Sequence, residues 1–355
     1  MLKLERRPGP SALMSWLSPL LALLLTVICG AILFAALGKN PLDGLRVFFI
    51  EPIRDLRGWT EVGVKAAPLL LIAVGLAICF RANVFNIGAE GQLVVGAITG
   101  GALALYLDPG DGEGGGALAI AAILVAGALG GMAWAAIVAF LRDRFNANEI
   151  LVSLMLVYVA QLLLNYLVHG PLRDPEGFNF PQSRLLSEGF LLPALIDGYR
   201  LHVGIVLALL ASAAGWLFLA RSFAGYRLQV GGMAPAAARY AGFSSRRALW
   251  TSLLASGALA GVAGVAEVIG PLGQLTPSVS PGYGFAAIIV AFVGRLHPVG
   301  VIFSSFVMAL FYIGGELAQT RLGMPNAVTG VFQGMLLFAL LACDVLIHYK
   351  PVWRK

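Results

Sequence analysis

The sequence is poor in charged residues, which make up only 12% of its 355 positions, whereas hydrophobic residues make up 59%. A water-soluble domain carries about a quarter charged residues. Such a composition leaves too little polar surface for a soluble fold, which excludes ordinary soluble enzymes and binding domains. The excess of apolar surface predicts a protein that crosses a membrane several times.

Residues that hold metals or nucleotides are also scarce. The cysteines are far apart and lie in or beside apolar runs, which favours packing over a disulfide framework or a metal site: Cys29, Cys79 and Cys343. The four histidines form no HExxH motif and no close cluster. The phosphate-binding pattern GxxxxGK[ST] does not occur, so the chain has no recognisable nucleotide site of its own. The net charge of +6 is explained by membrane orientation rather than by nucleic acid binding.

Long apolar stretches predict an all-α polytopic membrane protein of about ten transmembrane helices, with at least one broken or re-entrant segment. The predicted spans are 12–38, 61–80, 90–107, 117–141, 149–169, 202–220, 249–270, 284–296, 298–317 and 327–347. The first is longer than the apolar core of a cleaved signal, so we expect it to be retained. Arg295, His297 and Pro298 interrupt the chain after 284–296, which is therefore either a full crossing or a half-span.

The arginines and lysines predict the orientation of these spans. The loop 221–248 carries five arginines and no acidic residue, whereas 108–116 carries no positive charge. Because cytoplasmic loops are enriched in lysine and arginine, 221–248 and both termini are expected in the cytoplasm. The segment 170–201 is then extracytoplasmic, as an ordered cap or docking surface, or as a simple connection.

One polar segment, FRANVFNIGAEGQ at 80–92, separates two apolar runs. Charges inside the hydrocarbon cost about 2.5–3.5 kcal/mol each on insertion scales, so Arg81 and Glu90 need either an interface or a wet cavity. A broken helix bordering a transport path would use amides that donate and accept and glycines that let backbones approach. The candidate residues are Asn83, Asn86, Gly88, Glu90 and Gln92. An interfacial turn with a satisfied glutamate is the equal alternative.

Two further features lie in the apolar runs. Glu267 is near the outer end of its predicted span, which favours a side chain that extends to the interface. Small residues recur at helical spacing and predict close packing of helices: Gly127, Gly130, Gly131, Gly257, Gly261 and Gly264.

A short helix is predicted within the arginine-rich loop 221–248. Pro235 suits the first turn, alanines favour the helix, and Gly242 suits the left-handed position just after it. Phe243 is placed to close it with an apolar contact. A helix of about seven residues is too short to be stable alone and needs packing. Exposed Arg239 and Tyr240 suit docking into a soluble partner, and a helix lying on its own membrane domain is the alternative.

Three motifs together resemble the permease subunits of bacterial ABC importers. They are FRANVFNIGAEGQLVVGA at 80–97, NANEILVSLMLVYVA at 146–160 and VGGMAPAAARYAGFSSRR at 230–247. The resemblance extends over roughly 60–345, to the branched-chain amino acid and simple-sugar permease superfamily and most closely to its nucleoside-type branch. One departure is Gly232–Met233–Ala234, where asparagine would be expected after the glycine pair.

The resemblance implies one transmembrane permease domain over 1–355 in a bacterial cytoplasmic membrane. It implies cytoplasmic ATPase subunits that bind ATP, a second permease, and an extracytoplasmic substrate-binding lipoprotein. The segment 83–92 would border the translocation path. The loop would hold the coupling helix, with Pro235, Ala238, Arg239, Tyr240, Gly242 and Phe243 at the ATPase. The chain itself would bind no cofactor and catalyse no reaction.

Other functions fit parts of the sequence. An ion-coupled secondary transporter would use Glu90 or Glu267 as its ion site. An importer for simple sugars would have the same architecture. An intramembrane enzyme would need paired catalytic groups, which the apolar stretches do not provide. The cargo, and whether two permeases pair as like or unlike chains, cannot be derived from the residues.

Overall fold

The computed structural model describes residues 2–9, 11–110 and 114–353, which form two compact units. One unit contains the ends of the chain, up to residue 62 and from residue 307, and the other contains 63–306. Within the described residues, nine helices are long and apolar enough to cross a membrane, and one apolar helix is shorter. The prediction of an all-α polytopic membrane protein is therefore confirmed.

The unit of the chain ends contains α1 (Ala12–Ala36), α2 (Pro41–Leu45), a π-helical turn (Arg46–Ile50), a 3₁₀ turn (Glu51–Ile53), the start of α3 (Leu56–Arg81), most of α12 (Pro298–Leu322), and α13 (Ala327–His348). Helices α1 and α13 pack together, and four phenylalanine rings fill the interior beside them: Phe34, Phe48, Phe311 and Phe332. Strands β1 (Leu2–Arg6) and β2 (Tyr349–Trp353) pair antiparallel and join the two ends of the chain. This ribbon was not predicted from the sequence.

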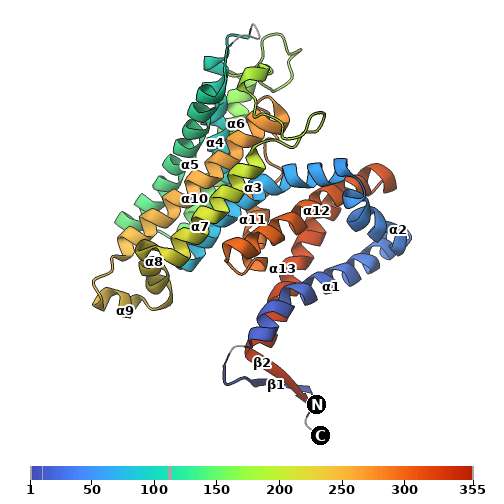
Figure 1. The fold of residues 1–355 in the computed structure, drawn as a ribbon, viewed down its shortest axis with the longest axis vertical. Coiled ribbons are helices and arrows are strands. Elements are labelled where there is room, and N and C mark those ends of the chain that lie inside the picture. Colours follow the sequence, from blue (N-terminus) through green and yellow to red (C-terminus); the bar gives the residue numbers. More distant parts are fainter. Residues whose placement is uncertain (1, 10, 111–113, 354–355) are drawn as a thin grey trace. The chain divides into compact units, whose positions relative to one another are not determined.

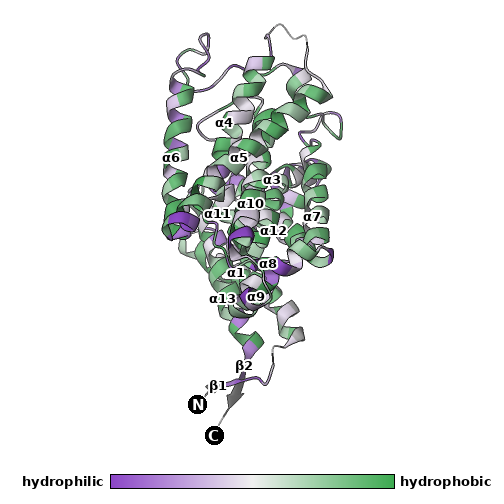
Figure 2. Ribbon diagram, turned by 90° about the vertical axis from the view of Figure 1, so that its left-hand side faces the viewer, coloured by the Kyte–Doolittle hydropathy of each residue, from purple (hydrophilic) through white to green (hydrophobic). Residues whose placement is uncertain are grey.

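The unit of residues 63–306 contains the rest of α3 and then α4 (Ala89–Leu107), α5 (Ala117–Phe145), α6 (Glu149–His169), a 3₁₀ turn (Glu188–Phe190), α7 (Gly204–Arg221), α8 (Phe223–Met233), α9 (Pro235–Tyr240), α10 (Ser245–Glu267), a π-helical turn (Val268–Leu272), α11 (Tyr283–Val293) and the start of α12. Hydrophobic residues run along helices such as α6 and α7, and hydrophilic residues gather at helix ends and in loops (Figure 2). The segment 170–201 and α9 lie at opposite ends of this unit (Figure 1).

Helices α4, α5 and α10 pack against one another through glycines. Gly257 and Gly261 of α10 face Gly131 and Gly127 of α5, and Gly96 of α4 also contacts Gly261. A Cβ at Gly127 would overlap the Val265 side chain, and a Cβ at any of the other four positions would overlap neighbouring backbone. The three helices can approach this closely only because these side chains are missing. The predicted close packing through small residues is confirmed.

Helix α11 has 11 residues and rises about 16 Å at about 1.5 Å per residue. The hydrocarbon core of a membrane is about 30 Å thick, so α11 alone does not cross it. Of the two interpretations of 284–296, the length of α11 favours the half-span. Irregular residues 273–282 precede α11, and the turn 294–297 connects it to α12.

Candidate functional site

The polar segment breaks the helical path, as the sequence predicted. Helix α3 ends at Arg81, residues 82–88 are non-helical, and α4 begins at Ala89. Asn83 has φ 55°, and the next N–H, that of Val84, bonds back to the carbonyl of Cys79 at 3.0 Å. A left-handed asparagine at this position ends a helix in the way glycine often does. The break is therefore written into the local sequence.

The segment 82–88 alternates like a strand. Ala82, Val84 and Asn86 are buried, whereas Asn83 and Phe85 are exposed. Alternation with period two is expected of extended backbone, where successive side chains point to opposite sides. One face of the segment is therefore built into the protein, and the other faces outward with an amide and an aromatic ring.

The buried face is held by two amides that bond to each other. Asn86 donates from Nδ2 to Gln92 Oε1 at 2.9 Å, and Gln92 donates from Nε2 to Asn86 Oδ1 at 3.1 Å. Asn86 also donates to Ser256 Oγ at 2.9 Å and accepts from the N–H of Gly88 at 3.2 Å. Asn86 and Gln92 are 0% and 1% exposed. These amides thus hold the broken segment against α4 and α10.

The start of α4 meets the start of α11 at Glu90. The carboxylate of Glu90, 1% exposed, accepts the N–H of Gly284 at 2.6 Å, and the Ser280 hydroxyl and the Gly282 N–H also bond to it. A carboxylate in the first turn of one helix and at the first turn of another is favoured by both helix dipoles. Gly284 leaves no room for a side chain, because a Cβ there would press on the Glu90 backbone.

Glu267 is buried at 6% exposure, so the expectation of a side chain extending to the interface was wrong. It lies within electrostatic range of Lys65 on α3 and of Arg200. Lys65 Nζ also lies 5.9 Å from the ring centre of Tyr283, the residue before Gly284. Sequence reasoning missed Lys65, because a single lysine near the start of an apolar run looks like an interfacial residue until its neighbours are known.

Arg81 connects three elements at the end of α3. Its Nε donates to the carbonyl of Leu296 at 2.8 Å, in the turn between α11 and α12, and its Nη1 donates to Gln229 Oε1 of α8 at 2.7 Å. The charge predicted to need an interface or a cavity is therefore bonded to carbonyl and amide oxygens of the protein.

The short helix in the arginine-rich loop is confirmed as α9. Gly242 has φ 77°, and the N–H of Phe243 bonds to the carbonyl of Ala238 at 2.9 Å, which closes the helix as predicted. Ala238 is buried at 4% exposure, whereas Tyr240 is 98% exposed. Helix α8, just before it, was not predicted; its residues had been interpreted as loop.

One cavity of about 390 Å³ brings a single predicted path residue, Asn83, together with part of the predicted coupling helix, whereas Asn86, Gly88, Glu90 and Gln92 do not line it. Asn83 of the broken segment lines it together with Pro235, Ala238, Arg239 and Phe243. The cavity therefore lies between α9 and the polar segment. Across residues 2–9, 11–110 and 114–353, no three His, Cys, Asp or Glu side chains come close enough to hold a metal ion.

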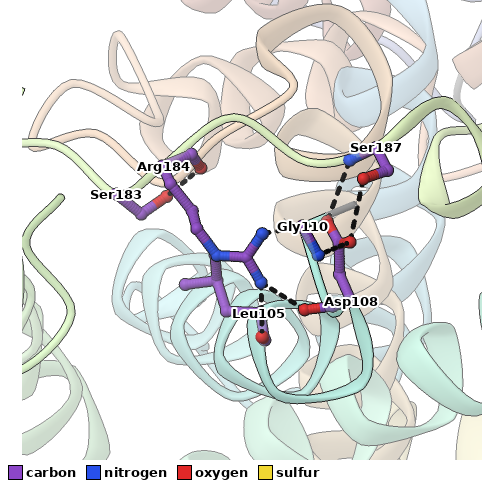
Figure 3. A network of polar contacts seen from close by, with 6 residues as sticks. All are labelled: Leu105, Asp108, Gly110, Ser183, Arg184 and Ser187. Carbon is purple, nitrogen blue, oxygen red and sulfur yellow. Dashed lines mark hydrogen bonds and ion pairs between the residues drawn. The ribbon is translucent and has the colours of Figure 1, made fainter. Parts of the chain in front are cut away.

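At the other end of the unit, the segment 170–201 is fixed to the end of α4 (Figure 3). Asp108, 2% exposed, accepts from the N–H of Ser187 and from its hydroxyl, both at 2.9 Å, and from the N–H of Gly110 at 2.9 Å. Arg184 forms an ion pair with it at 3.4 Å. Burial alone would raise the pKa of Asp108, but these hydrogen bonds and Arg184 outweigh it and lower the pKa below its usual value. The segment is thus an ordered cap.

Comparison with known proteins shows the family to which the chain belongs. Residues 59–341 match the family model described as branched-chain amino acid transport system / permease component. The chain is 32% identical to the glucose ABC transporter permease protein TsgB13 of Haloferax volcanii, over 98% of this chain and 93% of that protein. It is 31% identical to the guanosine ABC transporter permease protein NupP of Bacillus subtilis, over 89% of this chain and 90% of that protein.

It is also 26% identical to the nucleoside ABC transporter permease protein NupB of Lactococcus lactis, over 91% of this chain and 89% of that protein. No solved structure matches the chain significantly. The matched relatives are permeases of ABC transporters, and this chain is likewise a multi-pass membrane protein. With most of its length matched by the family model, the chain belongs to the family of branched-chain amino acid transport system permease components.

Proposed function

We propose that this chain is the transmembrane subunit of an ATP-driven importer of nucleosides or related small solutes. The observation that carries the proposal is the cavity that places α9, with its exposed Tyr240, directly beside the broken polar segment. The names of the relatives support the substrate class, since two are permeases for guanosine or nucleosides and one for glucose.

In this proposal the translocation path runs along the broken segment. Asn83 and the neighbouring Phe85 face outward and supply an amide and an aromatic surface, which suit a neutral nucleoside. The other four predicted residues are buried and do not face outward: Asn86, Gly88, Glu90 and Gln92. They fix the shape of the segment through the amide pair, the close contact of Gly88 with Ser153 and the bond of Glu90 to α11.

Helix α9 is the proposed coupling helix. Ala238 holds it to the protein, Pro235, Gly242 and Phe243 define its two ends, and Arg239 and Tyr240 face a partner. The partner would be a separate ATPase that binds and hydrolyses ATP, so this chain would carry no cofactor and no catalytic site. ATP binding would shift the bundle between outward and inward states only through contacts that differ between them, and α9 would supply that difference.

A second permease completes the proposed assembly. The chain is similar to two guanosine permease proteins of B. subtilis, NupP at 31% and NupQ at 28% identity, and two chains for one named substrate favour a pair of unlike permeases. The ordered cap of residues 170–201 would receive a substrate-binding lipoprotein.

We also propose that both termini and the loop 221–248 lie in the cytoplasm of a bacterial cell, whose cytoplasmic membrane the chain crosses. The β1–β2 ribbon supports this topology, because paired chain ends lie on one side of a membrane and require an even number of crossings. The described residues contain nine helices long enough to cross, which is an odd number of crossings. Residues 273–282 together with α11 would therefore make the tenth crossing.

A second function is favoured by one observation. Glu90 and Glu267 are buried within apolar helices, and Lys65 lies near Glu267, as in the ion site of a secondary transporter. Such a transporter would move its cargo without an ATPase.

One uptake experiment separates these functions. The chain is reconstituted in vesicles with the ATPase, second permease and lipoprotein of the proposed assembly, and uptake of labelled guanosine, adenosine, ribose and glucose is measured with and without ATP. ATP-dependent nucleoside uptake is expected. Uptake driven by a proton or sodium gradient alone would replace the proposal with the secondary transporter, and uptake of sugars only would change the substrate class.

Variants test α9 in the same vesicles. Tyr240→Ala combined with Arg239→Glu is expected to lower ATP-dependent uptake at least tenfold while the chain still inserts in the membrane, because its docking surface is lost. Arg247→Glu is the matched control, since Arg247 is an exposed arginine of the same loop that does not line the cavity. Equal losses in the two variants would contradict a specific role for α9.

A further inference from the structure

The cavity beside α9 is strongly basic. The end of α5, α8, α9 and the start of α10 contribute four arginines and one aspartate to its lining, an excess of three positive charges (four minus one): Arg142, Arg227, Arg239, Arg246 and Asp143. Positive residues are common in the loops of membrane proteins. Here four of them line one half-open cavity of about 390 Å³, although Arg239 and Arg246 are also exposed.

Two of the arginines already have carboxylate partners. Arg142 pairs with Glu149, and Arg246 Nε lies 2.7 Å from Asp143 Oδ2, which also accepts a hydrogen bond from Trp250 at 3.1 Å. The described part of the chain shows no ion pair for Arg227 or Arg239. The positive charge of the cavity is therefore only partly balanced by the protein.

Arg227 is positioned by an aromatic ring rather than by a carboxylate. Its guanidinium carbon lies 5.1 Å from the ring centre of Phe223, one helical turn earlier in α8. A guanidinium stacked on a ring keeps its N–H donors at its edge, in the fork that matches two oxygens of a phosphate. At the start of α10, Ser244 caps the helix by accepting the N–H of Arg247, and Ser244, Ser245 and Arg246 line the same cavity.

An apolar surface adjoins the basic cavity. Phe223 and Tyr226 of α8 are 65% and 55% exposed, and their rings lie 6.1 Å and 6.3 Å from the ring of Phe243, which lines the cavity. The cavity lies where two membrane-spanning helices, α5 and α10, end and begin. Exposed aromatic rings beside arginines at that depth are typical of contact with lipid headgroups and the first part of their chains.

We propose that this cavity binds the phosphate of an anionic phospholipid, with Arg227 as its main ligand and the lipid chain along Phe223 and Tyr226. A soluble phosphate would use the arginines but would leave the rings exposed to water, so the aromatic surface favours the lipid. The bound lipid would lie between α9 and the membrane-spanning helices. This site does not depend on an ATPase or on the nature of the cargo.

The full-length chain tests the proposal without any partner. It is purified in a neutral detergent, and native mass spectrometry counts the phosphatidylglycerol and phosphatidylcholine molecules that it retains over a lipid titration. Saturable retention of one phosphatidylglycerol, at least tenfold tighter than phosphatidylcholine, is expected. Arg227→Gln is expected to weaken it about fivefold or more, the effect of removing one cation at a lipid phosphate.

Two further variants make the result specific. Arg247→Gln removes an arginine of the same loop that does not line the cavity, and it is expected to leave retention unchanged. Asp143→Asn removes the one acidic residue of the lining, and it is expected to tighten retention. Equal weakening by Arg227→Gln and Arg247→Gln would reduce the effect to general surface attraction and overturn the site.

The source of the phosphate is tested by adding inorganic phosphate at millimolar concentration to the chain loaded with phosphatidylglycerol. Unchanged lipid retention is expected, because the rings hold the lipid chain. Release of the lipid by inorganic phosphate, or equal retention of phosphatidylcholine, would overturn the lipid as the ligand.

Discussion

The amide pair of Asn86 and Gln92 provides the sharpest test of how the broken segment is held. Asn86→Leu keeps a side chain of similar size but removes four hydrogen bonds: two with Gln92, one with Ser256 and one from the N–H of Gly88. Three groups are then left buried without these partners: the side-chain Oε1 and Nε2 of Gln92 and the backbone N–H of Gly88. At roughly 1–2 kcal/mol for each, the free energy of unfolding falls by about 3–6 kcal/mol.

The double variant Asn86→Leu with Gln92→Leu makes the reasoning stricter. It removes both side-chain amides, so of the three groups just named only the Gly88 N–H still lacks its partner. A buried polar group without a partner costs more than its absence, and the double variant is therefore expected to be more stable than Asn86→Leu alone by about 2 kcal/mol. Asn165→Leu, at an exposed position of α6, is the matched control and is expected to change stability by less than about 0.5 kcal/mol.

The assay is thermal unfolding of the full-length chain in detergent, followed by tryptophan fluorescence and by size-exclusion chromatography after heating. A single variant as stable as the Asn165→Leu control would refute the idea that the amides hold the segment. Gln92→Leu is measured alone in the same way. If the double variant loses as much unfolding free energy as Asn86→Leu and Gln92→Leu lose together, the pairing itself is refuted.

The same unfolding assay checks three further expectations. Gly261→Val is expected to destabilise the chain by about 2 kcal/mol or more, because the new side chain would overlap the backbone of Gly127. Asp108→Ala is expected to cost about 2–4 kcal/mol and to expose the segment 170–201 to added protease, since Arg184 and Ser187 lose their acceptor. Burial first, and then the nearby Arg200, lower the pKa of His202 to about 4 from the ordinary 6.5. Between pH 6.5 and pH 4 only the unfolded chain takes up the proton. The free energy of unfolding therefore decreases as the pH is lowered, and it is about 2 kcal/mol lower at pH 5 than at pH 8. His202→Gln is expected to remove that part of the dependence, and an unchanged pH profile would contradict it.

The features that could be predicted from the sequence depend on neighbouring residues. Apolar runs gave the spans because membrane insertion requires about 20 apolar residues in a row. The short helix α9 was predicted down to its ends, since Pro235 and Gly242 act through the local backbone alone. The break at 82–88 was predicted for the same reason, from asparagine and glycine between two apolar runs.

Features that join distant residues were missed. Glu90 and Gly284 are 194 residues apart, and no local pattern indicates that the N-termini of α4 and α11 meet. The partner of Glu267 on α3, Lys65, was equally hidden, so the glutamate was wrongly assigned to the interface. Helix α8 was overlooked because three glycines in it and two arginines in and before it resemble a loop, whereas its apolar side is stabilised by packing.

The contacts of Arg81 show how a movement of α9 would reach the broken segment. Arg81 bonds to Gln229 of α8, the helix that directly precedes α9 in the chain, and to the carbonyl of Leu296, which follows α11. Gly232 of α8 also packs against the backbone at Ala82. A displacement of the α8–α9 pair would therefore act on the segment at Ala82 and on the far end of α11, whose first turn holds Glu90. Because α4, α5 and α10 are locked together by backbone contacts at glycines, they cannot absorb such a displacement by gradual deformation. The shift would instead be taken up where helices are interrupted, at 82–88, directly after Arg81, and at 294–297, where Arg81 bonds to Leu296.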